Sequence, residues 1–167
     1  VEDSNGVYLS EVELIAKSGI RIDGVAGTSD GPTSRNGKLD GVYIEDSTLT
    51  VTGSEALSGV DNANQANLII TGQPGSAQLH IEESSGIIID ESSINTSGTI
   101  WMHGDGRTAQ SEILEYGNGI YITNTTLDSE SLYLEGYGAS ANQPDFTDEA
   151  GDLIPQKSLG IEIIAST

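Results

Sequence analysis

The stretch that decides the fold is GIYITNTTLDSESLYLEGYG, residues 119–138. Apolar residues alternate with polar or aromatic ones near its start and near its end, and a single leucine lies between polar corners in the middle. This period of two, broken by Thr, Asn, Ser and Gly, is typical of short half-buried strands joined by tight bends. The stretch predicts a coil of three strands, whose inward residues are Ile120, Ile122, Leu127, Leu132 and Leu134. One such coil leaves its apolar face uncovered, so it must stack on copies of itself.

Copies of this coil recur along the chain. They begin at five glycines separated by 35, 45, 33 and 41 residues, namely Gly6, Gly41, Gly86, Gly119 and Gly160. A shared core with loops of variable length, recurring within about 20–50 residues, is the signature of a solenoid. The sequence therefore predicts an all-β parallel β-helix with four coils plus the start of a fifth, three short strands per coil and long loops mostly at one corner. We expect residues 1–167 to form a single solenoid segment, which is a piece of a longer repeat protein.

The inward positions should form columns, because equivalent residues of neighbouring coils lie about 4.8 Å apart. The first strand contributes Val7, Val42, Ile87, Ile120 and Ile161, and beside them Leu9, Ile44, Ile89, Ile122 and Ile163. The second strand contributes Leu14, Leu49, Ile94 and Leu127. The third strand contributes Ile20 and Ile22, Leu68 and Ile70, Ile100 and Met102, and Leu132 and Leu134. We expect these columns to be the core of the protein.

The charge of the chain excludes several kinds of partner. Asp and Glu number 26 against 6 Lys and Arg, which gives a formal net charge of −20. Nucleic-acid phosphates and anionic membrane surfaces would be repelled by such a chain. No apolar run approaches the roughly 18 residues of a membrane helix, so we expect no membrane insertion. Cysteine is absent, which excludes disulfides and thiolate metal sites.

Aromatic residues recur at outward positions of the predicted strands. Tyr8, Tyr43 and Tyr121 share one position of the first strand, and Trp101 and Tyr133 share one position of the third. Exposed aromatic faces with a polar edge can stack on sugar rings, which makes these five residues candidates for glycan binding. The alternative is that aromatic pairs on adjacent strands only stabilise the sheet.

Acidic residues are stacked at the corner after the first strand. The candidates are Glu45 with Asp46 and, one coil later, Asp90 with Glu91. Like charges opposite one another on adjacent strands repel, and a calcium ion would remove that cost because it prefers carboxylate and carbonyl oxygens. The alternative is an acidic face that is simply solvated and screened. Calcium is therefore a possible cofactor on compositional grounds alone.

Catalytic residues are hard to assemble from this sequence. The two histidines, His80 and His103, do not share a column, and no nucleophile elbow, phosphate-binding loop or zinc motif occurs. A polysaccharide-active β-helix should bring carboxylates and cations together in one groove. Here the cations fall in expected loops. The loop of residues 28–38 holds Arg35 and Lys38, and later loops hold Arg107 and Lys157. The sequence therefore favours a protein that is not an enzyme.

The repeat resembles a known family. Its first half reads Gly-(Ile/Val)-x-Ile-x-x-(Ser/Thr)-(Ser/Thr)-(Leu/Ile), and a Leu-x-Leu-x-Gly strand follows. This pattern is similar to the repeats of filamentous-haemagglutinin-type exoproteins, large bacterial surface proteins exported by two-partner secretion. The resemblance implies a right-handed parallel β-helix, an extracellular or cell-surface location, and a role as stalk, adhesin or fibre.

Two functions remain open at this point. The first is a structural or adhesive segment of a secreted or cell-surface fibre, with no chemistry of its own. Its partners would be further coils of the same chain, identical chains end to end, and surface glycans. The second is a carbohydrate-binding or carbohydrate-active β-helix, which requires the groove of carboxylates and cations described above.

Overall fold

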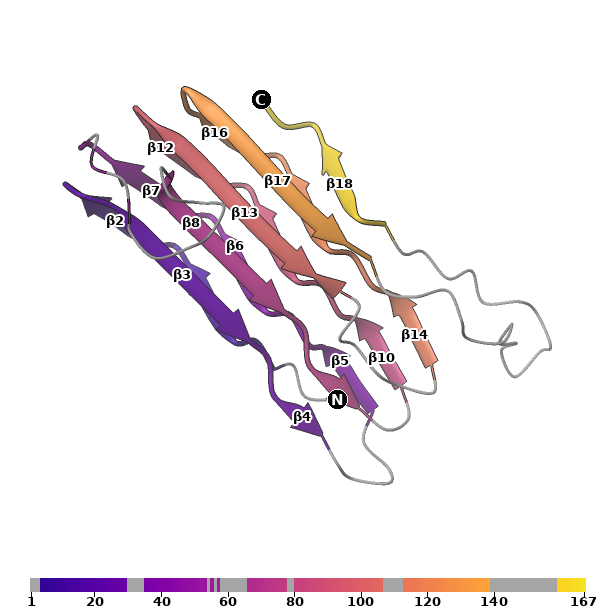
Figure 1. Cartoon of the computed structure of the whole chain (residues 1–167). Helices are drawn as coiled ribbons and strands as arrows, with labels where there is room; N and C mark the ends of the chain where they lie inside the picture. Colours follow the sequence, from indigo (N-terminus) through magenta and orange to yellow (C-terminus); the bar gives the residue numbers. More distant parts are fainter. Residues whose placement is uncertain are drawn as a thin grey trace.

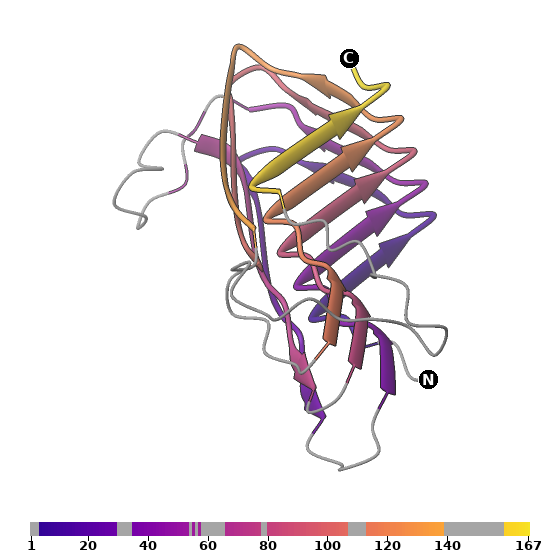
Figure 2. The same ribbon diagram turned by 90° about the vertical axis from the view of Figure 1, so that its right-hand side faces the viewer.

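The computed structural model describes residues 4–29, 35–53, 55, 57, 66–77, 80–106, 113–138 and 159–167. Every element in these residues is a β-strand, and every strand pair is parallel. The chain winds as a stack of coils whose strands lie above one another (Figure 1). In Figure 2 the nearest strands run towards the right, the chain returns behind them, and each coil lies above the previous one. The protein is therefore a right-handed parallel β-helix, as the sequence predicted.

Three sheets form the walls of the helix. Sheet one holds the strands that follow the repeat glycines, in the order β1 (Val7–Ser10), β6 (Val42–Glu45), β11 (Ile87–Asp90), β15 (Ile120–Thr123) and β18 (Ile161–Ile164). Sheet two holds β2 (Glu13–Ala16), β7 (Thr48–Val51), β12 (Ser93–Thr96) and β16 (Thr126–Asp128). Sheet three holds β3 (Ile20–Val25), β8 (Ala66–Gln73), β13 (Thr99–Asp105) and β17 (Ser131–Tyr137). This confirms four coils and the start of a fifth.

Coils two to four each contain a further strand, of which the sequence predicts only the one before coil three, as a small extra strand at residues 78–82. A side sheet is formed by β5 (Arg35–Lys38), β10 (His80–Glu83) and β14 (Ile113–Tyr116), each of which directly precedes a strand of sheet one. A two-stranded sheet pairs β4 (Thr28–Ser29) with β9 (Ser76–Ala77). The prediction of a loop throughout residues 28–38 is therefore wrong. The segment is rich in turn-forming residues, yet pairing with the next coil makes Arg35–Lys38 a strand, because β10 satisfies its backbone groups.

The predicted columns form the core, except for four exposed members in the end coils, namely Leu14, Leu132, Ile161 and Ile163. Val42, Ile44, Ile87, Ile89 and Ile120 are buried completely, and the other members of the core cluster lie in the same three sheets. Each residue packs on its equivalent in the next coil because the strands are in register, for example Ile89 on Ile44 and Ile122. The β-branched residues suit this stacked, pleated surface.

Two glycine columns allow adjacent coils to cross closely. A Cβ atom on Gly104, near the end of β13, would lie 1.9 Å from the carbonyl oxygen of Gly119, which opens the next coil. A Cβ atom on Gly72 would likewise lie 1.8 Å from the carbonyl oxygen of Gly86. Any side chain at these positions would collide with the backbone, which explains why both the repeat glycine and the glycine of the third strand recur.

None of the described residues belongs to a helix long and apolar enough to cross a membrane.

Candidate functional site

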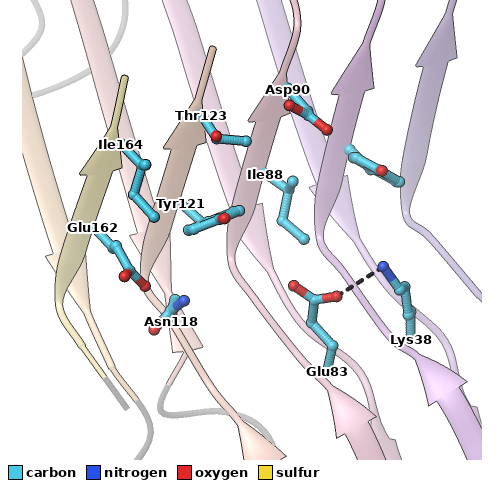
Figure 3. Close-up of a pocket in the computed structure, with 10 residues that line it drawn as sticks. Lys38, Glu83, Ile88, Asp90, Asn118, Tyr121, Thr123, Glu162 and Ile164 are labelled. Carbon is cyan, nitrogen blue, oxygen red and sulfur yellow. Dashed lines mark ion pairs between the residues drawn. The ribbon is translucent and has the colours of Figure 1, made fainter. Parts of the chain in front are cut away.

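A groove lies on the outer face of sheet one, next to the side sheet (Figure 3). Its volume is about 370 Å³, which falls within the range of small-molecule binding sites. The lining residues come from four coils and are Lys38, Tyr43, Glu83, Ile88, Asp90, Asn118, Tyr121, Thr123, Glu162 and Ile164. The strand alternation of sheet one puts Tyr43, Ile88 and Tyr121 outward at one shared position and Asp90 and Thr123 outward at the next.

The floor of the groove is apolar and aromatic. Ile88 lies between the equivalent Tyr43 and Tyr121 on the two neighbouring strands. It is only 3% exposed although it points away from the core. Tyr8, the first residue of this column, contacts Tyr43 with ring centres 5.5 Å apart but does not line the groove. The predicted column of tyrosines is thus confirmed as a surface feature, and two of the three contribute to a concave site.

Charged residues border this floor. Lys38, at the end of β5, forms an ion pair of 2.9 Å with Glu83 at the end of β10 (Figure 3). The Lys38 ammonium also lies 5.9 Å from the ring centre of Tyr43, within the reach of a cation–π contact. Asp90 and Glu162 add two further carboxylates. Among the described residues that line the groove there are therefore three carboxylates and one cation.

The ionised carboxylate of Glu45 is stabilised mainly by hydrogen bonds from hydroxyl groups. The hydroxyl of Tyr8 donates to its carboxylate, and Ser10 Oγ donates to the same oxygen over 3.0 Å. These bonds, Tyr8 first, hold the pKa of Glu45 below its usual value. Burial, and then hydrogen bonding to Glu45, raise the pKa of the Tyr43 hydroxyl far above its usual value, so Tyr43 is a neutral hydrogen-bond donor. The repulsion between Glu45 and Asp90, which are Cα partners, is partly offset in this way.

Asp46 and Glu91, two of the predicted calcium ligands, lie at the corner where the chain leaves sheet one. Asp46 and Glu91 have φ angles of 46° and 44°, in the left-handed region that Asp and Asn tolerate better than most residues. Both are exposed at the turn and neither lines the groove. The structure thus separates Asp46 and Glu91 from Asp90, which does line it.

The corner carbonyls are already occupied by hydrogen bonds. The carbonyl of Glu45 accepts from Glu11 N–H over 3.3 Å and from Ser47 Oγ over 2.7 Å. The carbonyl of Asp90 accepts in the same manner from Asp46 N–H and Ser92 Oγ. Within the described part of the chain, no three His, Asp or Glu residues are grouped so that they could hold a metal ion. Calcium at this corner stays a prediction, and an ion there would depend on carboxylates and water.

Trp101 and Tyr133 lie on another wall, the outer face of sheet three. Trp101 stacks on His103 with ring centres 5.7 Å apart and planes 7° apart. His103 Nδ1 lies 3.1 Å from Glu135 Oε2, and Tyr137 donates to the other oxygen of Glu135 over 2.5 Å. His103 is thus an outward residue aligned with Glu135 on the neighbouring strand. Trp101 also packs, with Leu57, against the cluster that contains Ile69, and none of these aromatic residues lines the groove.

Several groove residues were missed by the sequence analysis. Lys38 falls in an expected loop, and the sequence does not mark Glu83, Asn118, Thr123 or Glu162 as members of a site. The only available signal was their position relative to the repeat glycines: Asn118 directly precedes Gly119, and Thr123 occupies the position of Asp90 in the next coil. The side chains of Arg35 and His80, and all of Arg107 and Lys157, lie outside the described residues.

Comparison of the chain with protein-family models, with curated proteins and with solved structures gave no match.

Proposed function

We propose that this chain is a rigid adhesive segment of a secreted or cell-surface bacterial fibre of the filamentous-haemagglutinin type. The observation that carries the proposal is that the apolar columns run through the stack without interruption to both end faces. Leu14 in the first coil is 36% exposed, and Ile161 and Ile163 in the last are 39% and 49% exposed, although their equivalents in the middle coils are buried. These faces match the surfaces that each inner coil presents to its neighbours.

The end faces also carry strand edges. β1 and β18 are the outer strands of sheet one, and no strand of the described residues pairs with their free edges. Such edges are templates for pairing with another strand. Further coils of the same chain, or identical chains end to end, would cover both the edges and the exposed isoleucines. A stack extended in this way would be a stiff rod.

The flank of the rod supplies the adhesive surface. The groove of sheet one is concave, has an aromatic floor, and is bordered by groups that can donate and accept hydrogen bonds. This combination is typical of sites that bind small polar ligands with apolar faces, such as sugars. We therefore assign the attachment of surface glycans to this groove rather than to the aromatic residues of sheet three.

A carbohydrate-active β-helix is the second candidate, and one observation favours it. Lys38, which the sequence placed in a loop, lies in the groove with Glu83, Asp90 and Glu162. This is the combination of cation and carboxylates that the alternative requires. Against it, Lys38 is ion-paired with Glu83 at 2.9 Å, which occupies both groups.

One experiment separates the two functions. The purified protein is incubated with insoluble chitin, chitosan and polygalacturonate, and both the bound protein and newly formed reducing ends are measured. The adhesive proposal predicts retention on at least one polysaccharide with no release of product. Release of oligosaccharides that is abolished by Asp90→Asn would establish the enzymatic alternative. Absence of retention on all three would overturn the adhesive role of the groove.

A further inference from the structure

We propose that the groove of sheet one binds saccharides that carry amino groups and rejects saccharides that carry carboxylates. This inference rests on the adhesive part of the proposed function and specifies its ligand. It is argued from three properties of the described residues: the spacing of the aromatic floor, the charge of the rim, and the incomplete solvation of Asp90.

The floor suits a short run of sugar rings. Tyr43 and Tyr121 stand two strands apart on sheet one, with Ile88 between them, which separates them by about 10 Å along the stack. Two linked sugar rings span a similar length and present apolar C–H faces that pack on aromatic rings. A ligand lying along the axis of the β-helix would therefore contact both tyrosines and Ile88 together.

The rim selects for positive charge. Glu83, Asp90 and Glu162 supply three carboxylates, and Lys38 supplies one ammonium that is paired with Glu83. The whole chain adds a net charge of −20. An anionic saccharide would be repelled both by the rim and by this overall field, whereas a protonated amine would be attracted by both.

Asp90 is the residue best placed to bind that amine. Its Oδ1 atom is shielded from water and has no hydrogen-bond partner among the described residues. Its Cα partner on one side is Glu45, a second acid, and on the other side Thr123. A carboxylate that is incompletely solvated and lies beside another acid gains free energy when a cation approaches. An amine in the groove would supply that cation, and sugar hydroxyls could bond to Thr123 and Asn118.

Binding is measured with three trisaccharides of similar size by isothermal titration calorimetry at about pH 6, where carboxyl groups are ionised and amines are protonated. The probes are the glucosamine trimer, its N-acetylated form and the galacturonic acid trimer. We expect the glucosamine trimer to bind at least fivefold more tightly than the N-acetylated trimer, and the galacturonic acid trimer not to bind.

Two variants test whether the trisaccharides bind in the groove. Asp90→Asn should weaken binding of the glucosamine trimer about fivefold or more while changing that of the N-acetylated trimer less than twofold. Tyr121→Leu should weaken both about two- to tenfold, because the aromatic contribution does not depend on the amine. Matched controls are Asp128→Asn, an exposed acid on sheet two, and Tyr133→Leu, the exposed tyrosine of sheet three. Both controls should bind as the unaltered protein does.

Each contrary result has a definite meaning. Equal affinity for the glucosamine and N-acetylated trimers would overturn the preference for amines but leave the glycan-binding function intact. Absence of binding to all three would remove the function as well. Binding of polylysine as tight as that of the glucosamine trimer, unchanged in Tyr121→Leu, would show general attraction of cations to an acidic chain and would overturn the inference.

Discussion

The backbone N–H of Ser47 donates a hydrogen bond of 3.1 Å to the Oγ atom of Ser92, the equivalent residue one coil later. Ser92 Oγ in turn donates to the carbonyl of Asp90 over 2.7 Å. Thr125 and Ser166 repeat the arrangement, with Ser92 N–H donating to Thr125 Oγ1 and Thr125 N–H donating to Ser166 Oγ. This hydroxyl ladder satisfies backbone groups at a buried corner, where each coil turns from sheet one into sheet two.

The ladder makes a specific prediction about stability. Ser92→Ala would leave the Ser47 N–H buried without a partner, which typically costs about 1–3 kcal/mol of unfolding free energy. Ser92→Thr should retain most of the stability, because Thr125 plays the same role in the next coil. Ser97→Ala, at an exposed position of the same coil, is the control and should change little. Urea unfolding measures all three, and equal midpoints for the alanine variants would contradict a structural role for the ladder.

Glu45 gives a prediction about pH. Its folded pKa is lowered by Tyr8 and then Ser10, so the stabilisation is present above its unfolded pKa of about 4.3 and is lost as pH falls through the folded value. Acidification also relieves the repulsion among 26 carboxylates, so only a difference between variants is informative. The gap in melting temperature between the unaltered protein and Glu45→Gln should be largest near pH 6 and shrink towards pH 3.

The control for this measurement is Glu130→Gln, another exposed carboxylate, for which the gap should stay small across the same range. A gap for Glu45→Gln that is constant from pH 6 to pH 3 would show that the hydroxyls of Tyr8 and Ser10 do not favour the ionised form. Because the hydrogen bond between the Glu45 carboxylate and the Tyr8 hydroxyl is exposed, the difference in melting temperature should be small.

The sequence predicted the walls of this structure because their signal is local and repeated. Ile120 and Ile122 define an inward face by alternation alone, and their equivalents recur after every repeat glycine. The order and register of the strands in sheet one follow directly, since a slip of one residue would turn Tyr121 inward and Ile122 outward.

Only one strand of the side sheet could be predicted, the small extra strand at residues 78–82. Arg35–Lys38 reads as a turn, and it becomes a strand only because β10 of the next coil pairs with it. Lys38 and Glu83 meet through that pairing, 45 residues apart in the chain, so half of the groove depends on a non-local contact. The burial of Ile69 on the outer face of sheet three has a similar cause, since Leu57 of the insertion packs against the cluster that contains it.

Calcium gives a further prediction. An ion at the corner would depend on Glu45 or Asp46 and on water, because the corner carbonyls already accept two hydrogen bonds each and no three acids of the described residues are grouped to hold a metal. We therefore expect weak binding, with a dissociation constant of about 10⁻⁴–10⁻³ M, as in extracellular modules. Millimolar calcium at fixed ionic strength should raise the melting temperature more than magnesium does.

The gain from calcium should shrink in Asp46→Asn and persist in Asp128→Asn, which removes a charge from another wall. Equal melting in calcium and in chelator would leave the acidic corner as a solvated, screened face.

The most direct test of the open-ended β-helix is its self-association, measured by sedimentation velocity over a range of protein concentrations in salt that screens the negative charge, about 0.15 M or more. We expect oligomers whose size increases with protein concentration. Ile163→Lys should reduce them to monomers without lowering the melting temperature, because this residue is half exposed on the end face. Tyr133→Lys, on the flank, should still associate. A monomer at every concentration for the unaltered protein would contradict the account.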